Sequence, residues 1–298
     1  MNNPVIKDLI KLNLLKKNRL KIIALKVRNG STKVFQEKNS KIIVLEKNLI
    51  KKNYYSKYYE NFNIKFNKSK KFTFEKIEKN FIKLVKNNEE ERRLSLIKNN
   101  LHNNSKILDF GCGNLNFLNH LKKLKKYQNT FGVEKNKYIL KKNKNNFNLK
   151  DNILKFKDNF DVITMFHVLH YLPNQLETLK ILHNKLSKNG KIFIELPNAE
   201  DVLFKIKDFR SFTFCKESLV WHTGKSMYKI LNHIGFKNIK VNYIQRFGIT
   251  NHLYWLLSGK PDGHNKLKKM YDKKINIMYI KNLISNKCSD TLWIEGDK

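Results

Sequence analysis

Cysteine is scarce in this chain, and the few that occur are far apart. The three cysteines, Cys112, Cys215 and Cys288, form no Cys-x-x-Cys pair. That spacing is the one a zinc ribbon needs, and an odd, dispersed set also argues against a disulfide framework. We therefore expect neither a structural disulfide nor a bound metal.

Long apolar runs are also missing. The longest, such as 42–45 and 253–257, fall far short of the roughly 18 residues that a membrane span requires. Residues 1–27 mix Leu and Ile with Lys, and they contain neither an uninterrupted apolar stretch nor a small-residue cleavage site. The sequence thus predicts a cytoplasmic protein without a signal peptide or transmembrane segment.

Arginine is rare although positive charge is abundant. The formal net charge is +36, yet only six of the 61 basic residues are arginines. Proteins that read bases and phosphates favour the bidentate guanidinium, whereas these lysines are spread along the whole chain beside asparagines. Such a composition is typical of an AT-rich genome. An anionic partner (nucleic acid, membrane or polyanionic glycan) is the alternative interpretation.

The first 72 residues predict a small β-rich appendage. Two β-rich segments, 20–27 and 32–45, flank Asn29-Gly30, which is a strong hairpin signal. Predicted helices follow around 74–85 and 89–100. Between the hairpin and these helices lies a tyrosine cluster that we expect to pack at a domain junction: Tyr54, Tyr55, Tyr58 and Tyr59.

From residue 106 onward, apolar strand-like segments alternate with segments of helical periodicity. This alternation predicts a mostly parallel sheet with helices on both faces. The predicted strands are 106–110, 130–134, 161–166, 191–196, 238–244 and 290–294. The predicted helices include 117–124, a leucine-spaced helix over 172–186 with Gly190 at its C-terminal cap, and 226–234 ended by Gly235.

The segment 108–114, LDFGCGN, is the strongest functional signal. A strand that ends in an acidic residue and leads through a Gly-x-Gly turn into a helix brings backbone amides close to a ligand. Glu134 lies 25 residues beyond Asp109, at the end of the next strand, where its carboxylate can accept both hydroxyls of a ribose. The combination resembles class I S-adenosylmethionine methyltransferases. Leu115 stands where that family has a third glycine, and the phosphate-free cofactor tolerates a side chain there.

A second block, 160–173 (FDVITMFHVLHYLP), is similar to the fourth strand and following loop of the same family. His167 matches the family's first histidine, while His170 and Tyr171 replace its Glu and His. The resemblance implies a Rossmann-like seven-stranded sheet over 73–298 and S-adenosylmethionine as the cofactor. The cofactor contacts that it implies are Asp109, Gly111, Cys112, Gly113, Glu134, Asp151, Asn152, Ile153 and His167.

The segment 211–223 carries a narrower resemblance. It is similar to a Glu-His-Leu-x-x-(His/Phe)-Thr block of bacterial methyltransferases associated with sugars and surface polysaccharides, including sugar C-methyltransferases. In those enzymes the Glu-His pair contributes acid/base chemistry. This chain keeps Glu217, has Ser218 at the histidine, and lacks the cysteines of their N-terminal zinc module. The catalytic candidates are His167, His222 and Glu217.

The segment 245–264 is an insertion before the last strand. Its Gln, Arg, Asn and His side chains alternate with aromatics, which suits a polar, hydroxyl-rich ligand. The alternative is a packed cap whose polar groups satisfy its own loops. The candidate acceptor contacts are Gln245, Arg246, Asn251, His252 and Trp255.

Taken together, the sequence predicts methyl transfer from S-adenosylmethionine to a small-molecule or glycan acceptor, sugar-like in character. The charge suggests an RNA or other nucleic-acid methyltransferase as the main alternative. Against it, the fourth strand ends in Met-Phe-His-Val rather than the Asn/Asp-Pro-Pro-Tyr of amino-group nucleic-acid methylases. A quinone-type O-methyltransferase and a non-catalytic adenosylmethionine-binding protein are further alternatives, and the oligomeric state is left open.

Overall fold

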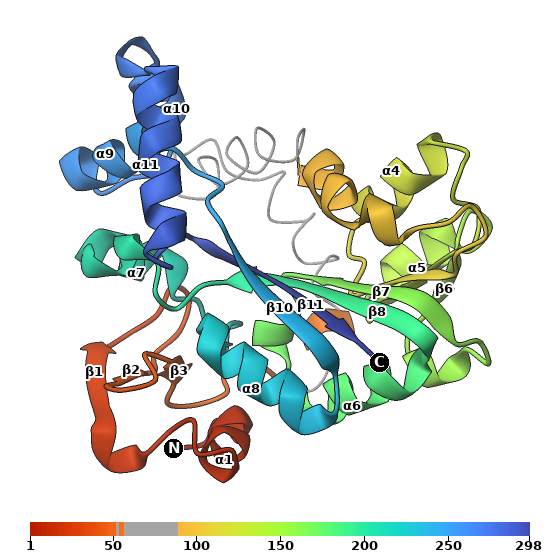
Figure 1. The fold of residues 1–298 in the computed structure, drawn as a ribbon. Helices are drawn as coiled ribbons and strands as arrows, with labels where there is room; N and C mark the ends of the chain where they lie inside the picture. The colour runs from red at the N-terminus through yellow and green to blue at the C-terminus, as the bar shows by residue number, and fades with distance from the viewer. Residues whose placement is uncertain (52–53, 57–88) are drawn as a thin grey trace. The chain divides into compact units, whose positions relative to one another are not determined.

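The computed structural model describes residues 1–51, 54–56 and 89–298 (Figure 1). The predicted helix at 74–85, the predicted domain boundary at 72/73, and Tyr58 and Tyr59 lie outside the described residues. The chain forms two compact units that alternate along the sequence. Unit 1 comprises Met1–Ile50, His167–Lys180 and Ile194–Glu295, and unit 2 comprises Lys51–Phe166, Ile181–Phe193 and Gly296–Lys298.

Unit 1 contains a four-stranded antiparallel sheet in the order β1-β2-β3-β9. The hairpin signal is confirmed, because Asn29 adopts a φ of +60° between the first two strands. Apolar side chains from this sheet form a core with Phe214 and Trp221. The appendage is thus β-rich as predicted, but its fourth strand comes from far along the chain. The strands are β1 (Leu20–Ala24), β2 (Val34–Glu37), β3 (Ile43–Leu45) and β9 (Val220–Trp221).

The helices of unit 1 begin and end where local chemistry specifies. Helix α8 (Gly224–Ile234) starts with a capping box, in which Thr223 and Ser226 each bond the other's backbone N–H. It ends at Gly235, whose φ of +109° suits glycine best. The other α-helices of unit 1 are α1 (Pro4–Lys11), α7 (Lys207–Thr213), α9 (Ile249–Ser258), α10 (Gly263–Lys266) and α11 (Lys273–Ser285).

A second sheet has seven strands in the order β10-β11-β8-β7-β4-β5-β6. Strands β6, β5, β4 and β7 pair in parallel, which confirms the predicted α/β class. Helices α4 (Asn116–Lys123) and α5 (Lys137–Asn143) connect parallel strands. The strands are β4 (Ile107–Phe110), β5 (Thr130–Val133), β6 (Asn148–Lys150), β7 (Phe160–Phe166), β8 (Leu186–Pro197), β10 (Lys237–Ile244) and β11 (Thr291–Asp297).

The strand order reverses direction between β4 and β7. From β4 the chain runs outward through β5 to β6, and it then returns to place β7 on the other side of β4. In open α/β sheets, ligands bind beyond the carboxyl ends of the strands at such a switch point. The Gly-x-Gly turn directly follows β4, so the topology places it at this position.

One predicted boundary is wrong. Gly190 does not cap a helix, because α6 (Gln175–Lys185) ends before it and β8 already begins at Leu186. A Cβ at position 190 would lie 2.8 Å from the Phe160 carbonyl oxygen. Close approach of backbone to backbone therefore requires this glycine, and a helix end does not.

Helix length bears on the membrane question. Within the parts of the chain that the structure describes, no helix is long and apolar enough to cross a bilayer.

Candidate functional site

The acidic end of β4 is buried and fixed. Asp109 is almost inaccessible to solvent, and its Oδ1 accepts a 2.9 Å hydrogen bond from the Thr164 hydroxyl on β7. Burial raises the pKa of this carboxyl to about 6, although the Thr164 bond and the positive charge of Arg93 act in the opposite direction. Asp109 thus secures the start of the turn to the neighbouring strand.

The turn after β4 leaves open space beside Gly113. Gly113 has a φ of +50°, and the nearest described atom to a Cβ built there is the Gly111 carbonyl oxygen, 4.0 Å away. Among the described residues no side chain crowds the backbone at this point, whereas side chains crowd Gly132 on the adjacent strand. Such an uncovered backbone suits the close approach of a nucleoside-type ligand.

Glu134 meets this turn from the end of β5. Its Oε2 accepts the Gly113 N–H at 2.9 Å, and its Oε1 accepts the Asn136 N–H at 2.9 Å. A carboxylate has about four lone-pair positions, so these two bonds orient it and leave acceptor capacity for two hydroxyls. The two residues that the motif singled out are therefore in direct contact, 21 residues apart in the sequence.

Leu115 explains the departure from a third glycine. It adopts a left-handed φ of +61° at the start of α4, which a leucine rarely does. Its side chain is buried with Cys112, Leu118 and Ile139, so it packs into the core. The cost of the backbone conformation is offset by this burial. Burial also raises the pKa of the Cys112 thiol, which leaves it protonated.

The predicted adenine segment follows β6. Asn152 accepts the Leu154 N–H at 3.0 Å and thereby caps a short helical turn, while the Ile153 side chain is buried. Asp151 is half-exposed and forms a 2.7 Å ion pair with Lys155. The Glu134 N–H donates to the Lys150 carbonyl, which ties this segment to the end of β5. The segment therefore has the apolar Ile153 next to the polar side chains of Asp151 and Asn152.

A charged cluster is built around His167, the residue after β7. The imidazole Nε2 lies 3.0 Å from Glu195 Oε1 and 3.3 Å from Arg246 Nη1. The Glu195 carboxylate is fully buried, whereas the His167 side chain is about a quarter exposed. His167 is also held through its backbone, because its N–H donates to the Glu195 carbonyl at 2.7 Å and its φ is +56°.

Arg246 is fixed in this cluster by Asp290. The Asp290 carboxylate accepts the backbone N–H of Arg246 at 2.9 Å and lies 3.4 Å from its Nε. The acid also binds Gln245 Nε2 at 3.0 Å, so one carboxylate fixes both neighbouring residues. The guanidinium remains one-fifth exposed at the His167 ring.

Comparison with known proteins decides the family. A family described as a methyltransferase domain matches residues 70–241, which is more than half of the chain. The chain belongs to this methyltransferase family. No curated protein matches it significantly. The family and its fold identify S-adenosylmethionine as the cofactor, and the open turn at Gly113 beside Glu134 suits it.

Solved structures share the fold of this methyltransferase. A SAM-dependent methyltransferase from Archaeoglobus fulgidus is 19% identical, with a TM-score of 0.51 over 81% of this chain and 100% of that one. The plantazolicin methyltransferase BamL, solved with a triazolic desmethylPZN analog and SAH, is 14% identical. Its TM-score is 0.50 over 83% of this chain and 93% of that one.

His222 occupies a different environment from the one expected of a base. It is fully buried, its Nε2 lies 2.8 Å from Gln175 Oε1, and its Nδ1 lies 3.3 Å from the Ser226 hydroxyl. Burial lowers its pKa to about 3. A neutral ring with both nitrogens occupied joins α8 to the first residue of α6, and this favours a structural role. Glu217 lies half-buried in the turn before β9.

Most of the predicted acceptor contacts are buried among other residues of unit 1. His252 accepts from Gln245 Nε2 at 3.1 Å and donates from Nδ1 to the Tyr279 hydroxyl at 2.8 Å. Burial lowers the pKa of His252 to about 4. Trp255 is buried against Phe209. Asn251 is also buried, and its Oδ1 has no hydrogen-bond partner among the described residues. Of the five predicted contacts, Arg246 is the one that is not buried.

Three contributors to the site were missed in the sequence. Glu195 had a signal, because it is a carboxylate inside the apolar strand 191–196. Thr164 and Asp290 carried no such sequence signal. A hydroxyl side chain within a strand and an acidic residue at the start of a strand are both common. All three hold a predicted site residue in position.

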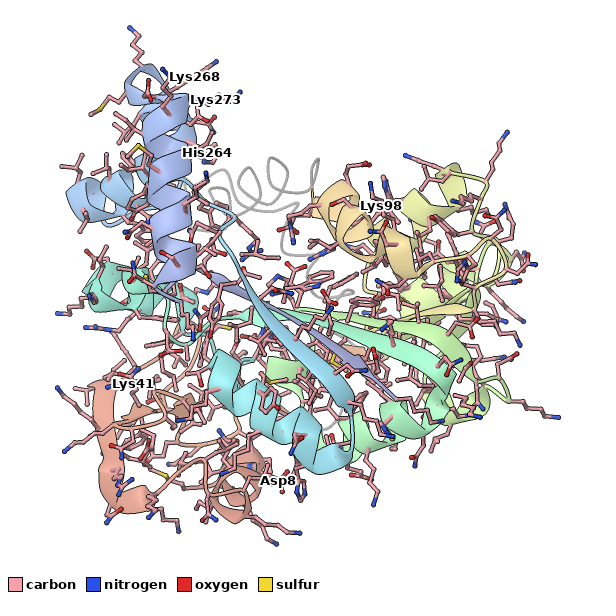
Figure 2. The ribbon with its side chains drawn as sticks, viewed as in Figure 1. Asp8, Lys41, Lys98, His264, Lys268 and Lys273 are labelled. Atoms are coloured by element: carbon pink, nitrogen blue, oxygen red, sulfur yellow. The ribbon has the colours of Figure 1, made fainter. Side chains whose placement is uncertain are left out.

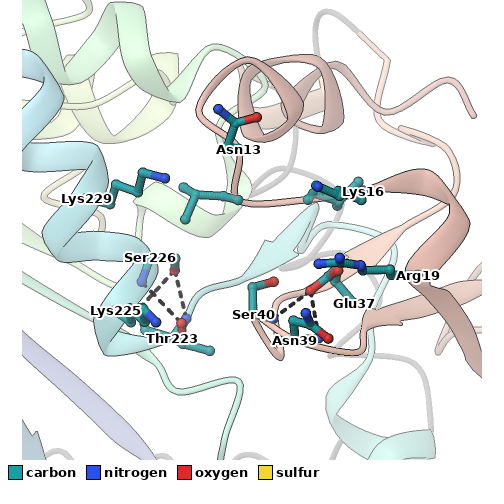
Figure 3. A pocket seen from close by; sticks show the side chains of 12 residues that line it. Asn13, Lys16, Arg19, Glu37, Asn39, Ser40, Thr223, Lys225, Ser226 and Lys229 are labelled. Atoms are coloured by element: carbon teal, nitrogen blue, oxygen red, sulfur yellow. Dashed lines mark hydrogen bonds between the residues drawn. The ribbon is translucent and has the colours of Figure 1, made fainter.

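A separate cavity of about 240 Å³ lies in unit 1, away from these residues (Figure 3). The basic side chains of Lys16, Arg19, Lys225 and Lys229 line it together with Glu37. Glu37 accepts the backbone N–H groups of Asn39 and Ser40, so it stabilises the turn between β2 and β3. None of the predicted site residues lines this cavity.

Proposed function

We propose that this methyltransferase acts on a small-molecule or glycan acceptor that carries hydroxyl groups and is sugar-like in character. The observation that carries the proposal is the cluster of His167, Glu195 and Arg246. A hydroxyl nucleophile must lose its proton during methyl transfer, and a histidine can accept it near neutral pH. The cluster supplies such a base together with a fixed cation.

His167 is the base in this proposal. The Glu195 carboxylate can only accept and lies 3.0 Å from Nε2, closer than the Arg246 Nη1 donor at 3.3 Å, so we assign the hydrogen to Nε2 and the lone pair to Nδ1. It also stabilises the imidazolium that forms when the ring takes a proton. Glu195 therefore acts through His167 as a positioning residue.

Arg246 is the acceptor contact in this proposal. Its side chain is partly exposed beside the base, and five N–H donors in a rigid fork suit hydroxyl or phosphate oxygens. Gln245 binds Asp290, which holds Arg246, and His252 in turn contacts Gln245. The insertion thus supports one contact residue with several buried polar side chains.

The cofactor lies against unit 2 in this proposal. Glu134 accepts the ribose hydroxyls, and the backbone of the turn formed by Gly111, Cys112 and Gly113 approaches the cofactor. Asp109 secures the turn, and 151–153 flank the adenine. When bound, S-adenosylmethionine supplies an activated methyl group, so the protein mainly orients the acceptor and removes its proton.

The sugar-like character rests on the resemblance of the segment 211–223. Glu217 matches that block, whereas Ser218 stands at its histidine. Since His222 is buried with both ring nitrogens occupied, we assign the acid/base role to His167 instead. The polar Arg246 beside the base agrees with a hydroxyl-rich acceptor.

The test is methyl transfer from S-adenosylmethionine to a panel of nucleoside diphosphate sugars and free glycans, followed by mass spectrometry. We expect one class of sugar to gain the mass of a methylene group. In the same assay His167→Ala should lower kcat by about 10²–10⁴-fold, the contribution of a general base. Arg246→Ala should raise KM and leave cofactor affinity intact.

The matched control is His222→Ala, which we expect to lower the melting temperature without a comparable loss of kcat per folded molecule. Methylation of RNA oligonucleotides with no sugar modified would contradict the proposal and favour the nucleic-acid alternative. Cofactor binding without transfer to any acceptor class would favour a non-catalytic protein.

A further inference from the structure

Exposed apolar side chains are concentrated in one part of unit 1. Among the described residues, eight of the seventeen exposed large apolar side chains lie between positions 256 and 284. We name the segment 249–285, which comprises α9, α10, the short helix Lys268–Met270 and α11, the helical finger (Figure 1). The eight residues are Leu256, Leu257, Met270, Tyr271, Ile275, Ile277, Met278 and Ile284.

The tip of the finger combines these apolar side chains with lysines. Residues 268–275 read KKMYDKKI, and all eight are exposed. Met270, Tyr271 and Ile275 are 63%, 52% and 56% exposed. Figure 2 shows Lys268 and Lys273 at the free end of the finger. The only acid of the tip, Asp272, accepts the Ile275 N–H at 2.8 Å and so caps α11.

The finger is anchored behind its tip. The Asn276 side chain accepts the Ile249 N–H at 3.0 Å, and the Tyr279 hydroxyl bonds His252 at 2.8 Å. Of the residues of α11, only Asn276 and Leu283 are buried. These two hydrogen bonds hold α11 against α9 and so fix the base of the tip. Most of α11 is exposed to solvent.

We propose that the helical finger binds the surface of a membrane that contains anionic lipid. Met270, Tyr271 and Ile275 enter the boundary between headgroups and acyl chains, and the four tip lysines contact anionic headgroups. Apolar area and juxtaposed lysines contribute separately to such binding. A tyrosine suits the interfacial depth because one end of its ring is apolar and the other is polar.

Charge and chemistry favour lipid over other occupants. Aliphatic side chains gain little from a phosphate backbone, and the chain contains no arginine after Arg246. Lysine is depleted in the core of protein–protein interfaces. A second copy of this face would bring its lysines against the same lysines. The proposal goes beyond methyl transfer and does not depend on which acceptor is modified.

The first experiment is co-sedimentation of the full chain with two kinds of vesicle. One contains phosphatidylcholine alone, and the other contains equal amounts of phosphatidylcholine and phosphatidylglycerol. We expect strong binding to the anionic vesicles and weak binding to the neutral ones. Met270→Ser combined with Tyr271→Ser should reduce binding to anionic vesicles about 10-fold or more, because apolar contact is lost without any change of charge.

Matched controls separate the finger from the general charge of the chain. Leu25→Ser combined with Leu154→Ser removes two exposed apolar side chains elsewhere and should leave binding unchanged. Replacing four tip lysines with glutamine should weaken binding roughly five-fold per lysine, and replacing four distant lysines should have a much smaller effect. The tip set is Lys268, Lys269, Lys273 and Lys274, and the distant set is Lys123, Lys125, Lys137 and Lys141.

A fluorescent reporter tests insertion directly. The three native tryptophans, Trp221, Trp255 and Trp293, are almost fully buried. Tyr271→Trp therefore adds an exposed indole whose emission dominates any change. On anionic vesicles we expect its emission to shift to shorter wavelength and to be quenched by brominated acyl chains.

The proposal is overturned if the tip and distant lysine sets weaken vesicle binding equally, or if the added indole shows no shift on bound vesicles. It is also overturned if the chain self-associates and Met270→Ser with Tyr271→Ser abolishes that association but not vesicle binding. Melting curves and S-adenosylhomocysteine binding serve as folding checks, because no tip residue belongs to the cofactor or base sites.

Discussion

At the scale of single residues, the Glu134 carboxylate offers the most direct test of the cofactor site. Glu134→Ala removes the acceptor of the Gly113 N–H and, in the proposed site, of two ribose hydroxyls. We expect S-adenosylmethionine binding to weaken by about 1–3 kcal/mol, the scale of lost charge-assisted hydrogen bonds. Calorimetry measures this change. Asp158→Ala, at a half-buried acid of the same unit that pairs with Lys106, is the control, and equal affinity in both variants would remove Glu134 from the site.

Glu195 tests the positioning of the base. Glu195→Gln keeps a side chain of the same shape but removes the charge beside His167. We expect kcat to fall and the pH–rate profile to move to lower pH, because the imidazolium loses its stabilising carboxylate. A steady-state profile over pH measures both effects. A uniform fall in rate with an unchanged profile would show that Glu195 is only structural.

Asp201 predicts a pH dependence of stability. Burial, reinforced by the negative charge of Asp290, raises its pKa from the ordinary value of 3.8 to about 8. The folded state thus holds the proton more tightly than the unfolded chain does, so stability is full at low pH and falls as pH rises toward about 8. The slope is at most about 1.4 kcal/mol per pH unit.

Asp201→Asn should flatten this dependence, because the amide oxygen still accepts the Leu203 N–H and carries no charge. Urea unfolding at several pH values measures it, with the exposed Asp208→Asn as the control. A steep dependence that persists in Asp201→Asn would assign it to another group.

The meeting of Gly113 with Glu134 could be predicted from sequence because both follow strands of one local strand–helix–strand unit. Gly113 and Glu134 sit at the ends of adjacent strands, and the strand pattern alone brings them together. The base cluster could be predicted only in part. Glu195 is 28 residues from His167, and Arg246 is 79 residues from it, so their meeting depends on tertiary packing. The burial of His222 also depends on tertiary packing, which sequence does not show.

At the scale of elements, helix ends were easier to predict than strand starts. Gly235 ends α8 through a left-handed backbone, which is a local property. Gly190 lies inside β8, and the contact that requires it comes from Phe160 on another strand. A glycine after a helical segment can therefore end the helix or allow close backbone packing, and only the tertiary structure distinguishes the two roles.

Gly190→Ala tests this assignment. The added methyl group would lie 2.8 Å from a backbone carbonyl that cannot rotate away. We expect a loss of about 1–3 kcal/mol in the free energy of unfolding, the usual cost of overpacking. Urea denaturation measures it, and Lys188→Ala on the exposed part of the same strand is the control. A helix-capping role would predict no more than about 1 kcal/mol.

At the scale of the whole molecule, the net charge of +36 predicts weak, unspecific attraction to polyanions. If the lysines reflect genome composition, binding to random RNA should be largely lost by physiological salt. Fluorescence anisotropy of a labelled RNA in rising salt measures this. Tight, salt-resistant and structure-selective binding would instead favour the nucleic-acid alternative.

The pairing of β3 with β9 has a consequence for biosynthesis. Ile43 lies opposite Trp221, so the N-terminal sheet cannot be completed until more than two-thirds of the chain has left the ribosome. Until then the apolar edge of β3 has no partner, and unpaired strand edges invite misassociation in nascent chains. The first three strands of this sheet are therefore synthesised well before the strand that completes it.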